Sequence, residues 1–121
     1  MLGAAGSTDP RALRDVDSSA RMLAAAWGAP IPVGHVGGSG TRVGEIVRAA
    51  RRSGRRVVVA SYLMAPGFFY EQLAASGADI ATRPLLDGAE VEPELVSLVL
   101  DRFADAAEQL DWASARVPAQ M

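Results

Sequence analysis

Apolar residues recur along the chain with periods that alternate between helix and strand. After Asp9 and Pro10, they are spaced by three and four, which is typical of one stripe of an amphipathic helix. The members of this stripe are Leu13, Val16, Ala20, Leu23 and Trp27. Asp9 suits the N-cap, Pro10 the first helical position, and Gly28 the end. The pattern therefore predicts a first helix between Pro10 and Gly28.

The next part of the chain predicts an extended segment, a helix and a buried strand. PIPVGHV (30–36) is extended, and GGSGT (37–41) breaks the chain before a helix that Thr41 can cap. That helix carries Val43, Ile46, Val47 and Ala50, and it closes at Ser53 and Gly54. RRVVVASYL (55–63) is apolar on both faces, as expected for a central strand of a parallel sheet.

The remaining pattern adds two helices and one strand. FFYEQLAAS (68–76) predicts a helix that ends at Gly77, and ADIATRPL (78–85) predicts a strand. A last helix near Pro93 is expected to bury Val96, Val99, Leu100, Phe103 and Leu110. Strands that alternate with helices imply a three-layer α/β/α fold with a parallel sheet of about four strands. The strand before the first helix, MLGAA, is short, and we expect it to be stunted or truncated.

Length and composition indicate one soluble globular domain. With the pattern of elements, we expect an α/β domain over residues 1–112 and a C-terminal tail at 113–121. The sequence has no apolar run long enough for a membrane span and no signal peptide, so we expect a cytoplasmic protein without a membrane partner. A net charge of −2 gives no electrostatic reason to expect nucleic acid. Without cysteine and with one histidine, His35, the chain cannot supply a thiolate or multi-histidine metal site.

Three loops leave the carboxyl ends of predicted strands, where ligands bind in doubly wound sheets. They are AAGSTDP (4–10), HVGGSGT (35–41) and SYLMAPGFF (61–69). The first two join glycine and hydroxyl residues to a helix N-terminus, which favours anions, but neither matches a phosphate loop or a dinucleotide fingerprint. On loop chemistry alone, the favoured interpretation is that these loops are tight turns in which Asp9 and Thr41 are ordinary helix caps.

The third loop begins the segment SYLMAPGFFYEQL (61–73), which holds most of the chain's aromatic residues. Of seven aromatic residues, four lie in this segment: Tyr62, Phe68, Phe69 and Tyr70. Three consecutive aromatics on one helical turn point in three directions, so they cannot all face the same core. At least one is expected to line a cleft or to meet another subunit. The alternative is that Tyr70 is a plain surface residue.

These segments together resemble a known family. SYLMAPGFFYEQL (61–73), followed by GADIATRPL (77–85) and PELVSLVLDRF (93–103), is similar to the class II chelatases (CbiX-like), the sirohydrochlorin cobalto- and ferrochelatases of cobalamin and siroheme synthesis. AAGSTDPRA (4–12) resembles the opening turn of that family, Gly-His-Gly-Ser-x-Asp-Pro. The resemblance covers about residues 3–108.

The resemblance implies a chelatase-like parallel α/β sheet and insertion of Co²⁺ or Fe²⁺ into a tetrapyrrole, with the metal as substrate and without an organic cofactor. It implies substrate-binding roles for Gly6, Ser7, Asp9, Ser61, Tyr62, Pro66, Gly67 and Phe69. Arg11, Arg42 or Arg83 could meet substrate carboxylates. His35 is a candidate metal ligand, although it matches no family histidine, and the catalytic residues are unknown.

Two departures from the family pattern concern the histidines. Ala5 stands where the opening turn of the family has its metal-binding histidine, and Phe69 or its neighbour stands where short members have a second one. Neither side chain can ligate a metal or accept a proton. The chain thus resembles the histidine-poor C-terminal half of long members, and it is expected to form a homodimer or to pair with a catalytic half.

Two other functions compete with chelation. One is a non-catalytic tetrapyrrole- or metal-binding protein, or a dimerisation domain. The other, a receiver-type signalling domain, is disfavoured because it needs an acidic cluster at the strand ends and a lysine. The chain has no lysine.

Overall fold

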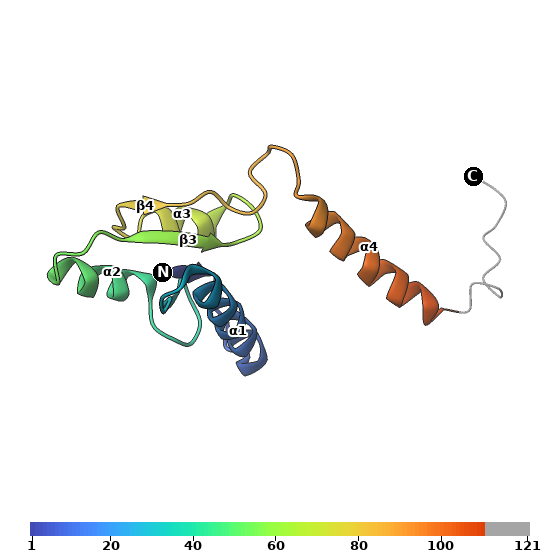
Figure 1. The fold of residues 1–121 in the computed structure, drawn as a ribbon, viewed down its shortest axis with the longest axis horizontal. Helices are drawn as coiled ribbons and strands as arrows, with labels where there is room; N and C mark the ends of the chain where they lie inside the picture. Colours follow the sequence, from blue (N-terminus) through green and yellow to red (C-terminus); the bar gives the residue numbers. More distant parts are fainter. Residues whose placement is uncertain (111–121) are drawn as a thin grey trace. The chain divides into compact units, whose positions relative to one another are not determined.

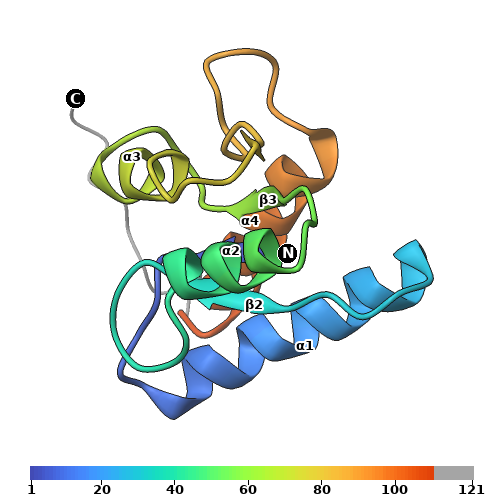
Figure 2. The ribbon, with the colours of Figure 1, turned by 90° about the vertical axis from the view of Figure 1, so that its left-hand side faces the viewer.

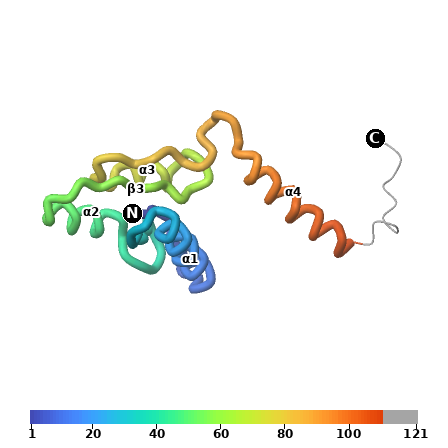
Figure 3. The backbone as a smooth tube through the Cα atoms, in the orientation of Figure 1, coloured from blue at the N-terminus to red at the C-terminus, as the bar shows by residue number. Residues whose placement is uncertain are grey.

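The computed structural model describes residues 1–110, in two compact units that divide after Gly88. Figures 1 and 3 follow the chain through its elements. The first unit contains β1 (Leu2–Ala4), α1 (Pro10–Trp27), β2 (Val33–His35), α2 (Val43–Arg52), β3 (Val58–Tyr62), α3 (Phe68–Ala74) and β4 (Ile80–Ala81). The second unit contains α4 (Pro93–Glu108).

The four strands form one parallel sheet in the order β2-β1-β3-β4. Ala4 of β1 pairs with His35 on one side and with Tyr62 on the other, so these three residues form one row across the sheet. The row lies at the carboxyl ends of the strands. The predicted parallel sheet of four strands is confirmed, with β1 as short as the sequence predicted.

Helices cover both faces of the sheet. A β-carbon placed on Gly3 would lie 2.5 Å from a Leu73 methyl group of α3, and one on Gly34 would lie 2.8 Å from the Cα of Val43 in α2. α2 and α3 therefore share one face, which we call the α2–α3 face. α1 lies on the other face, the α1 face, and Figure 2 shows α1 and α2 on opposite sides of β2. The three-layer α/β/α fold is confirmed.

The hydrophobic core lies on the α2–α3 face, between the sheet and helices α2 and α3. Its buried members are Val43, Val47, Val57, Val59, Leu63 and Leu73. Val59 and Leu73 are fully buried, and both would contact any side chain at Gly3. The absence of a side chain at position 3 thus lets α3 approach β1 closely.

β3 has one buried face and one exposed face. Val59 and Ser61 are buried on the α2–α3 face, whereas Val58 and Tyr62 are 48% and 41% exposed on the α1 face. β3 is an internal strand, as its composition predicted, but α1 lies over β2 and leaves this part of the α1 face open in the first unit.

Helix ends agree with the sequence at some positions and differ at others. Asp9 caps α1 and Gly28 ends it in the left-handed conformation, as predicted. Thr41 does not cap α2, because Arg42 is the N-cap residue and no side chain bonds the helix start. The Thr41 carbonyl instead accepts a hydrogen bond from the His35 amide at 2.8 Å. This bond ties the loop back to β2 and moves Thr41 out of the cap position.

In the second unit, α4 begins at Pro93, as predicted, and runs to Glu108. The sequence predicted that its apolar stripe is buried. In the structure α4 has no buried residue, so the second unit by itself does not cover this stripe, and the prediction is wrong for this unit. Leu110 lies beyond the helix end. The predicted tail at 113–121 lies outside the described residues.

The carboxylate of Asp79 ties the start of β3 to β4. It accepts a hydrogen bond from the Val57 amide at 2.6 Å, and it forms an ion pair with the Arg51 guanidinium at 3.2 Å. The amide hydrogen bond, aided by Arg51, lowers the pKa of Asp79 below its usual value.

A group whose pKa is lowered by folding stabilises the protein above its unfolded pKa, and that stability is lost as pH falls through the folded pKa. We therefore expect unfolding midpoints in urea to decrease below about pH 4. Asp79→Asn should flatten this acid limb, whereas Asp17→Asn, on the exposed side of α1, should leave it unchanged. Equal acid limbs in the Asp79 variant and the parent chain would exclude this role.

Candidate functional site

A cavity of about 200 Å³ lies at the carboxyl ends of β1, β2 and β3, beside the start of α1. We call it the β1–β2 cavity. It is lined by Ala4, Ala5, Gly6, Ser7, Ala12, Leu13, Val16, His35 and Tyr62. The row of paired residues across the sheet forms its floor, and α1 forms one wall. This is the edge at which parallel α/β sheets bind ligands.

The two loops beside the cavity are joined by backbone hydrogen bonds. The Gly37 amide donates to the Ala5 carbonyl at 2.9 Å, and the Ser39 amide donates to the Ser7 carbonyl at 3.0 Å. A β-carbon at Gly6 would lie 1.9 Å from the Gly37 carbonyl oxygen, and Gly6 has a φ of +96°. Only glycine permits this approach, so the loop glycines hold the cavity rim in place.

The start of α1 is capped from within the same loop. The Asp9 carboxylate accepts from the Arg11 amide at 2.9 Å and pairs with the Arg11 guanidinium at 2.8 Å. The Arg11 side chain lowers the pKa of Asp9, and the amide bond adds to this effect. Ser7 Oγ accepts from the Asp9 amide at 2.9 Å. Asp9 and Arg11 thus neutralise each other outside the cavity lining.

His35 is the one titratable side chain that is buried in the lining. The residue is 6% exposed, and its Nδ1 is buried without a hydrogen-bond partner. A β-carbon at Gly40 would lie 2.7 Å from His35 Cδ2, and Gly40 has a φ of +102°. The second loop therefore makes room for the imidazole by having glycine at this position.

Tyr62 connects the sheet floor to α1. Its hydroxyl lies 3.0 Å from Ser19 Oγ of α1, so the two groups share a hydrogen bond. This contact fixes the phenol beside the cavity, although 41% of the residue is exposed. Tyr62 is thus the one member of the aromatic segment that lines the β1–β2 cavity.

The three consecutive aromatic side chains after β3 do not all face the core, as the sequence predicted, whereas the predicted cleft or subunit contact stays a prediction. Tyr70 is partly buried and packs against the core, whereas Phe68 and Phe69 are 67% and 50% exposed. The two phenylalanine rings pack edge to face with centroids 5.6 Å apart. The alternative of a plain surface Tyr70 is wrong. The exposed aromatic surface at this edge belongs to Phe68 and Phe69.

The structure brings together only some of the predicted site residues. Gly6, Ser7, Tyr62 and His35 line one cavity. Asp9 caps α1, and Ser61 lies buried on the α2–α3 face, where its amide donates to Thr82 Oγ1 at 2.8 Å. Pro66, Gly67 and Phe69 are exposed in the next loop and at the start of α3, and they do not line the cavity.

The sequence analysis did not identify the apolar residues of the cavity lining as part of a site. Ala12, Leu13 and Val16 carry no chemistry, and their positions match any helix that packs on a sheet. Two of the candidate arginines already have acidic partners: Arg11 pairs with Asp9, and Arg83 pairs with Asp87 at 2.6 Å. They are therefore less available to a substrate carboxylate than the sequence suggested.

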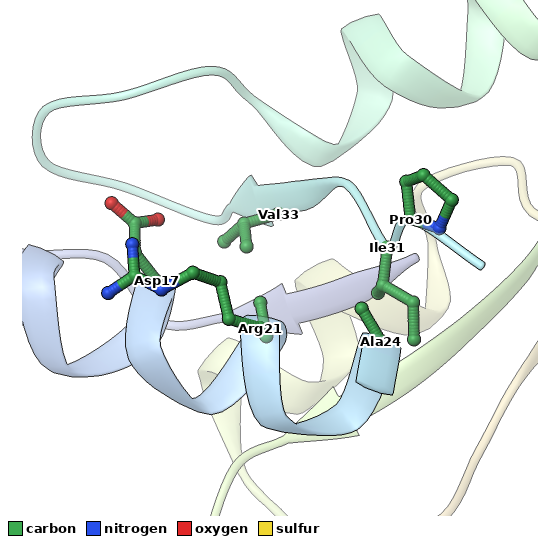
Figure 4. A pocket seen from close by; sticks show the side chains of 7 residues that line it. Asp17, Arg21, Ala24, Pro30, Ile31 and Val33 are labelled. Atoms are coloured by element: carbon green, nitrogen blue, oxygen red, sulfur yellow. The ribbon is translucent and has the colours of Figure 1, made fainter. Parts of the chain in front are cut away.

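A larger hollow of about 520 Å³ lies between α1 and the segment that leads into β2. Figure 4 shows its wall residues, with Asp17, Arg21 and Ala24 on α1 and Pro30, Ile31 and Val33 opposite. No predicted site residue lines it. The charged residues of its lining are Asp17 and Arg21, and the Arg21 guanidinium also donates to Ser18 at 3.0 Å.

Within residues 1–110, no three His, Cys, Asp or Glu side chains converge to form a metal site. In the same part of the chain, none of the helices combines the length and the apolar character needed to cross a bilayer. The candidate site is thus an apolar cavity with one buried imidazole and a rim of hydroxyl and amide groups.

Comparison with protein-family models matches CbiX to residues 1–106. The chain belongs to the CbiX family of class II chelatases. The match spans the sheet and all four helix starts, and it confirms the family that the sequence motifs indicated. Searches of curated proteins and of solved structures give no significant match.

As a CbiX protein, the chain is a chelatase-type domain of the family that inserts divalent metals into sirohydrochlorin-like tetrapyrroles. In this family the metal is a substrate. The β1–β2 cavity lies beside Ala5, in the turn where the family pattern has histidine.

Proposed function

We propose that this chain is a histidine-poor CbiX half that binds a sirohydrochlorin-type tetrapyrrole at the carboxyl edge of its sheet. Metal insertion, of Co²⁺ or Fe²⁺ in cobalamin or siroheme synthesis, then depends on a second half. The observation that carries this proposal is Ala5. It lies in the cavity wall at this edge, where the family pattern places its metal-binding histidine.

The chemistry of metal insertion explains why the missing histidines matter. Two pyrrole N–H protons must leave as the metal enters, so the site needs a proton acceptor and a ligand that releases the metal. An imidazole serves both purposes near neutral pH. Neither Ala5 nor Phe69 can do so, and we expect the chain alone to insert metal weakly or not at all.

The exposed aromatic surface supports macrocycle binding. Phe68 and Phe69 stand at the start of α3, on the same sheet edge as the β1–β2 cavity, and together offer flat apolar area. A macrocycle would gain from stacking on such rings. We assign Tyr62, Pro66, Gly67 and Phe69 to the macrocycle side of the cleft, and Gly6, Ser7 and Asp9 to its rim. Ser61 has less support because it lies on the other face.

We propose a second copy of the chain or a separate catalytic half as the partner that supplies histidines. The same exposed phenylalanine pair would suit such a subunit contact. Assignment of His35 as a metal ligand, the cytoplasmic location and the lack of an organic cofactor stay predictions.

The alternative function is a non-catalytic tetrapyrrole- or metal-binding protein, or a dimerisation domain. The absence of both family histidines favours it. The two functions differ in one expected result. If the chain is non-catalytic, adding a histidine-bearing partner would not raise the rate of metal insertion.

Binding can be tested by titrating sirohydrochlorin with the purified chain and following the absorbance of the macrocycle. We expect saturable binding that Phe69→Ser weakens about tenfold or more, because a stacked aromatic contact is lost. Val91→Ser, an equally exposed apolar position in the second unit, is the control and should bind normally. No spectral change with a folded chain would refute the proposal.

A further inference from the structure

The buried imidazole of His35 lacks a partner that its environment should supply. A buried polar nitrogen without a hydrogen bond destabilises a protein. Here Nδ1 is buried and unpartnered in His35, a residue that is 6% exposed and that lines the β1–β2 cavity. The absence of a side chain at Gly40 leaves space for this ring.

The other polar groups of the cavity indicate the charge of a ligand that would suit it. Ser7 and Tyr62 contribute hydroxyl groups, and none of the lining residues is acidic. The cavity also borders the N-terminus of α1, an 18-residue helix. The first N–H groups of a helix have no partner inside it and carry partial positive charge.

Most of these N–H groups are already used, but one is left at the cavity. Pro10 has none, the Arg11 amide donates to the Asp9 carboxylate, and the Leu13 amide donates to the Asp9 carbonyl at 3.2 Å. That leaves the amide of Ala12, which is a lining residue. The positive helix end, the hydroxyl groups and the absence of acids favour an anion over a cation.

The size of the cavity limits what part of a ligand can enter. Pockets that hold whole drug-sized ligands have about 300–1,000 Å³. The β1–β2 cavity has about 200 Å³. A tetrapyrrole ring cannot enter, but one acetate- or propionate-sized arm can.

We propose that the β1–β2 cavity is a carboxylate subsite in which Ser7 Oγ–H and the Ala12 amide receive one carboxylate arm of the macrocycle, and in which the His35 ring turns so that its Nδ1–H, which has almost no accessible surface in this structure, also reaches the carboxylate. The identity of the arm rests on the proposed function, whereas the carboxylate chemistry does not. Occupation of this subsite would fix the rotation of the macrocycle on the aromatic surface. His35 would then position the substrate and would not take part in the reaction.

The single histidine makes a direct test possible by NMR, because only one imidazole resonance exists. The probes are sodium propionate, uncharged propionamide and CoCl₂, each titrated into the full chain at constant pH and ionic strength. We expect propionate to shift the His35 ring and the Ser7 and Ala12 amides with one saturation curve. Propionamide should bind about tenfold more weakly, because it lacks the charge.

Two substitutions separate recognition from folding. His35→Asn keeps a donor near the Nδ1 position and should retain propionate binding. His35→Leu removes the donor and should weaken binding about tenfold or more, as expected for a lost hydrogen bond to a charged group. Because it also removes a buried unpaired nitrogen, His35→Leu should fold at least as stably as the parent chain.

The source of the carboxylate is tested with sirohydrochlorin and its methyl ester. His35→Leu should reduce affinity for the acid and not for the ester. The proposal is overturned if propionate gives no saturable shift, if propionamide binds equally well, or if only Co²⁺ affects the ring. Propionate binding without sirohydrochlorin binding would keep the carboxylate site and refute the proposed function.

Discussion

The double substitution Ala5→His/Phe69→His is expected to raise the rate of Co²⁺ insertion into sirohydrochlorin by at least about 100-fold over the parent chain. A positioned proton acceptor contributes about 10²–10⁴-fold to such reactions. Ala5 lines the β1–β2 cavity, and Phe69 is half exposed at the start of α3, after β3; these are the two positions that we match to the histidines of the family pattern. Absorbance of the metallated macrocycle measures the rate.

The matched control is Ala5→Gln/Phe69→Gln, which adds polar side chains of similar length without a basic nitrogen. It should stay at the rate of the parent chain. Ala5 packs partly against the core, so far-UV circular dichroism must show that each variant is folded. An equal rise in both double variants, or none in a folded histidine variant that binds the macrocycle, would argue against the assigned histidine positions.

Leu73→Ala is expected to lower the free energy of unfolding by about 2–5 kcal/mol, the range for fully buried leucines. Leu73 is 0% exposed and holds α3 against β1 and β3. Urea unfolding followed by circular dichroism measures the change. Leu85→Ala, at a 51% exposed position, is the control and should lose no more than about 0.5 kcal/mol.

The contact of Leu73 with Gly3 allows a sharper test by a double-mutant cycle. Gly3→Ala places a β-carbon 2.5 Å from a Leu73 methyl group and should cost about 1–3 kcal/mol from overpacking. In Gly3→Ala/Leu73→Ala, the Leu73 methyl group is gone. The double variant should therefore lose less unfolding free energy than the sum of the losses in the two single variants. Strict additivity would mean that α3 does not pack over β1 as the structure shows.

The periodic parts of the fold were predictable because each element has a local signal. Asp9, Pro10 and Gly28 mark the ends of α1, and the apolar run of β3 marks an internal strand. Thr41 was mistaken for a cap because its carbonyl bonds to His35, a tertiary contact that no local pattern reveals. The open part of the α1 face was also unpredictable, because coverage depends on where a helix lies across the sheet.

The candidate site was predictable in its edge and partly in its members. Chain order alone brings the three loops to one edge, and the consecutive aromatics correctly indicated that not all of their rings face the core. The role of His35 could not be predicted, because its environment depends on the row that it forms with Ala4 and Tyr62 and on space at Gly40. Ser61 and Tyr62 were both expected at the site, but adjacent residues of a strand alternate sides, and of these two only Tyr62 lies on the α1 face.

The central claim is that the chain binds the macrocycle but cannot complete metal insertion by itself. It is tested most directly by one spectrum of sirohydrochlorin with the chain, recorded before and after addition of Co²⁺. The account predicts a saturable spectral change on adding the chain, and then a rate of metallation no higher than in buffer. Fast metallation by the parent chain, or an unchanged macrocycle spectrum in the presence of a folded chain, would contradict it.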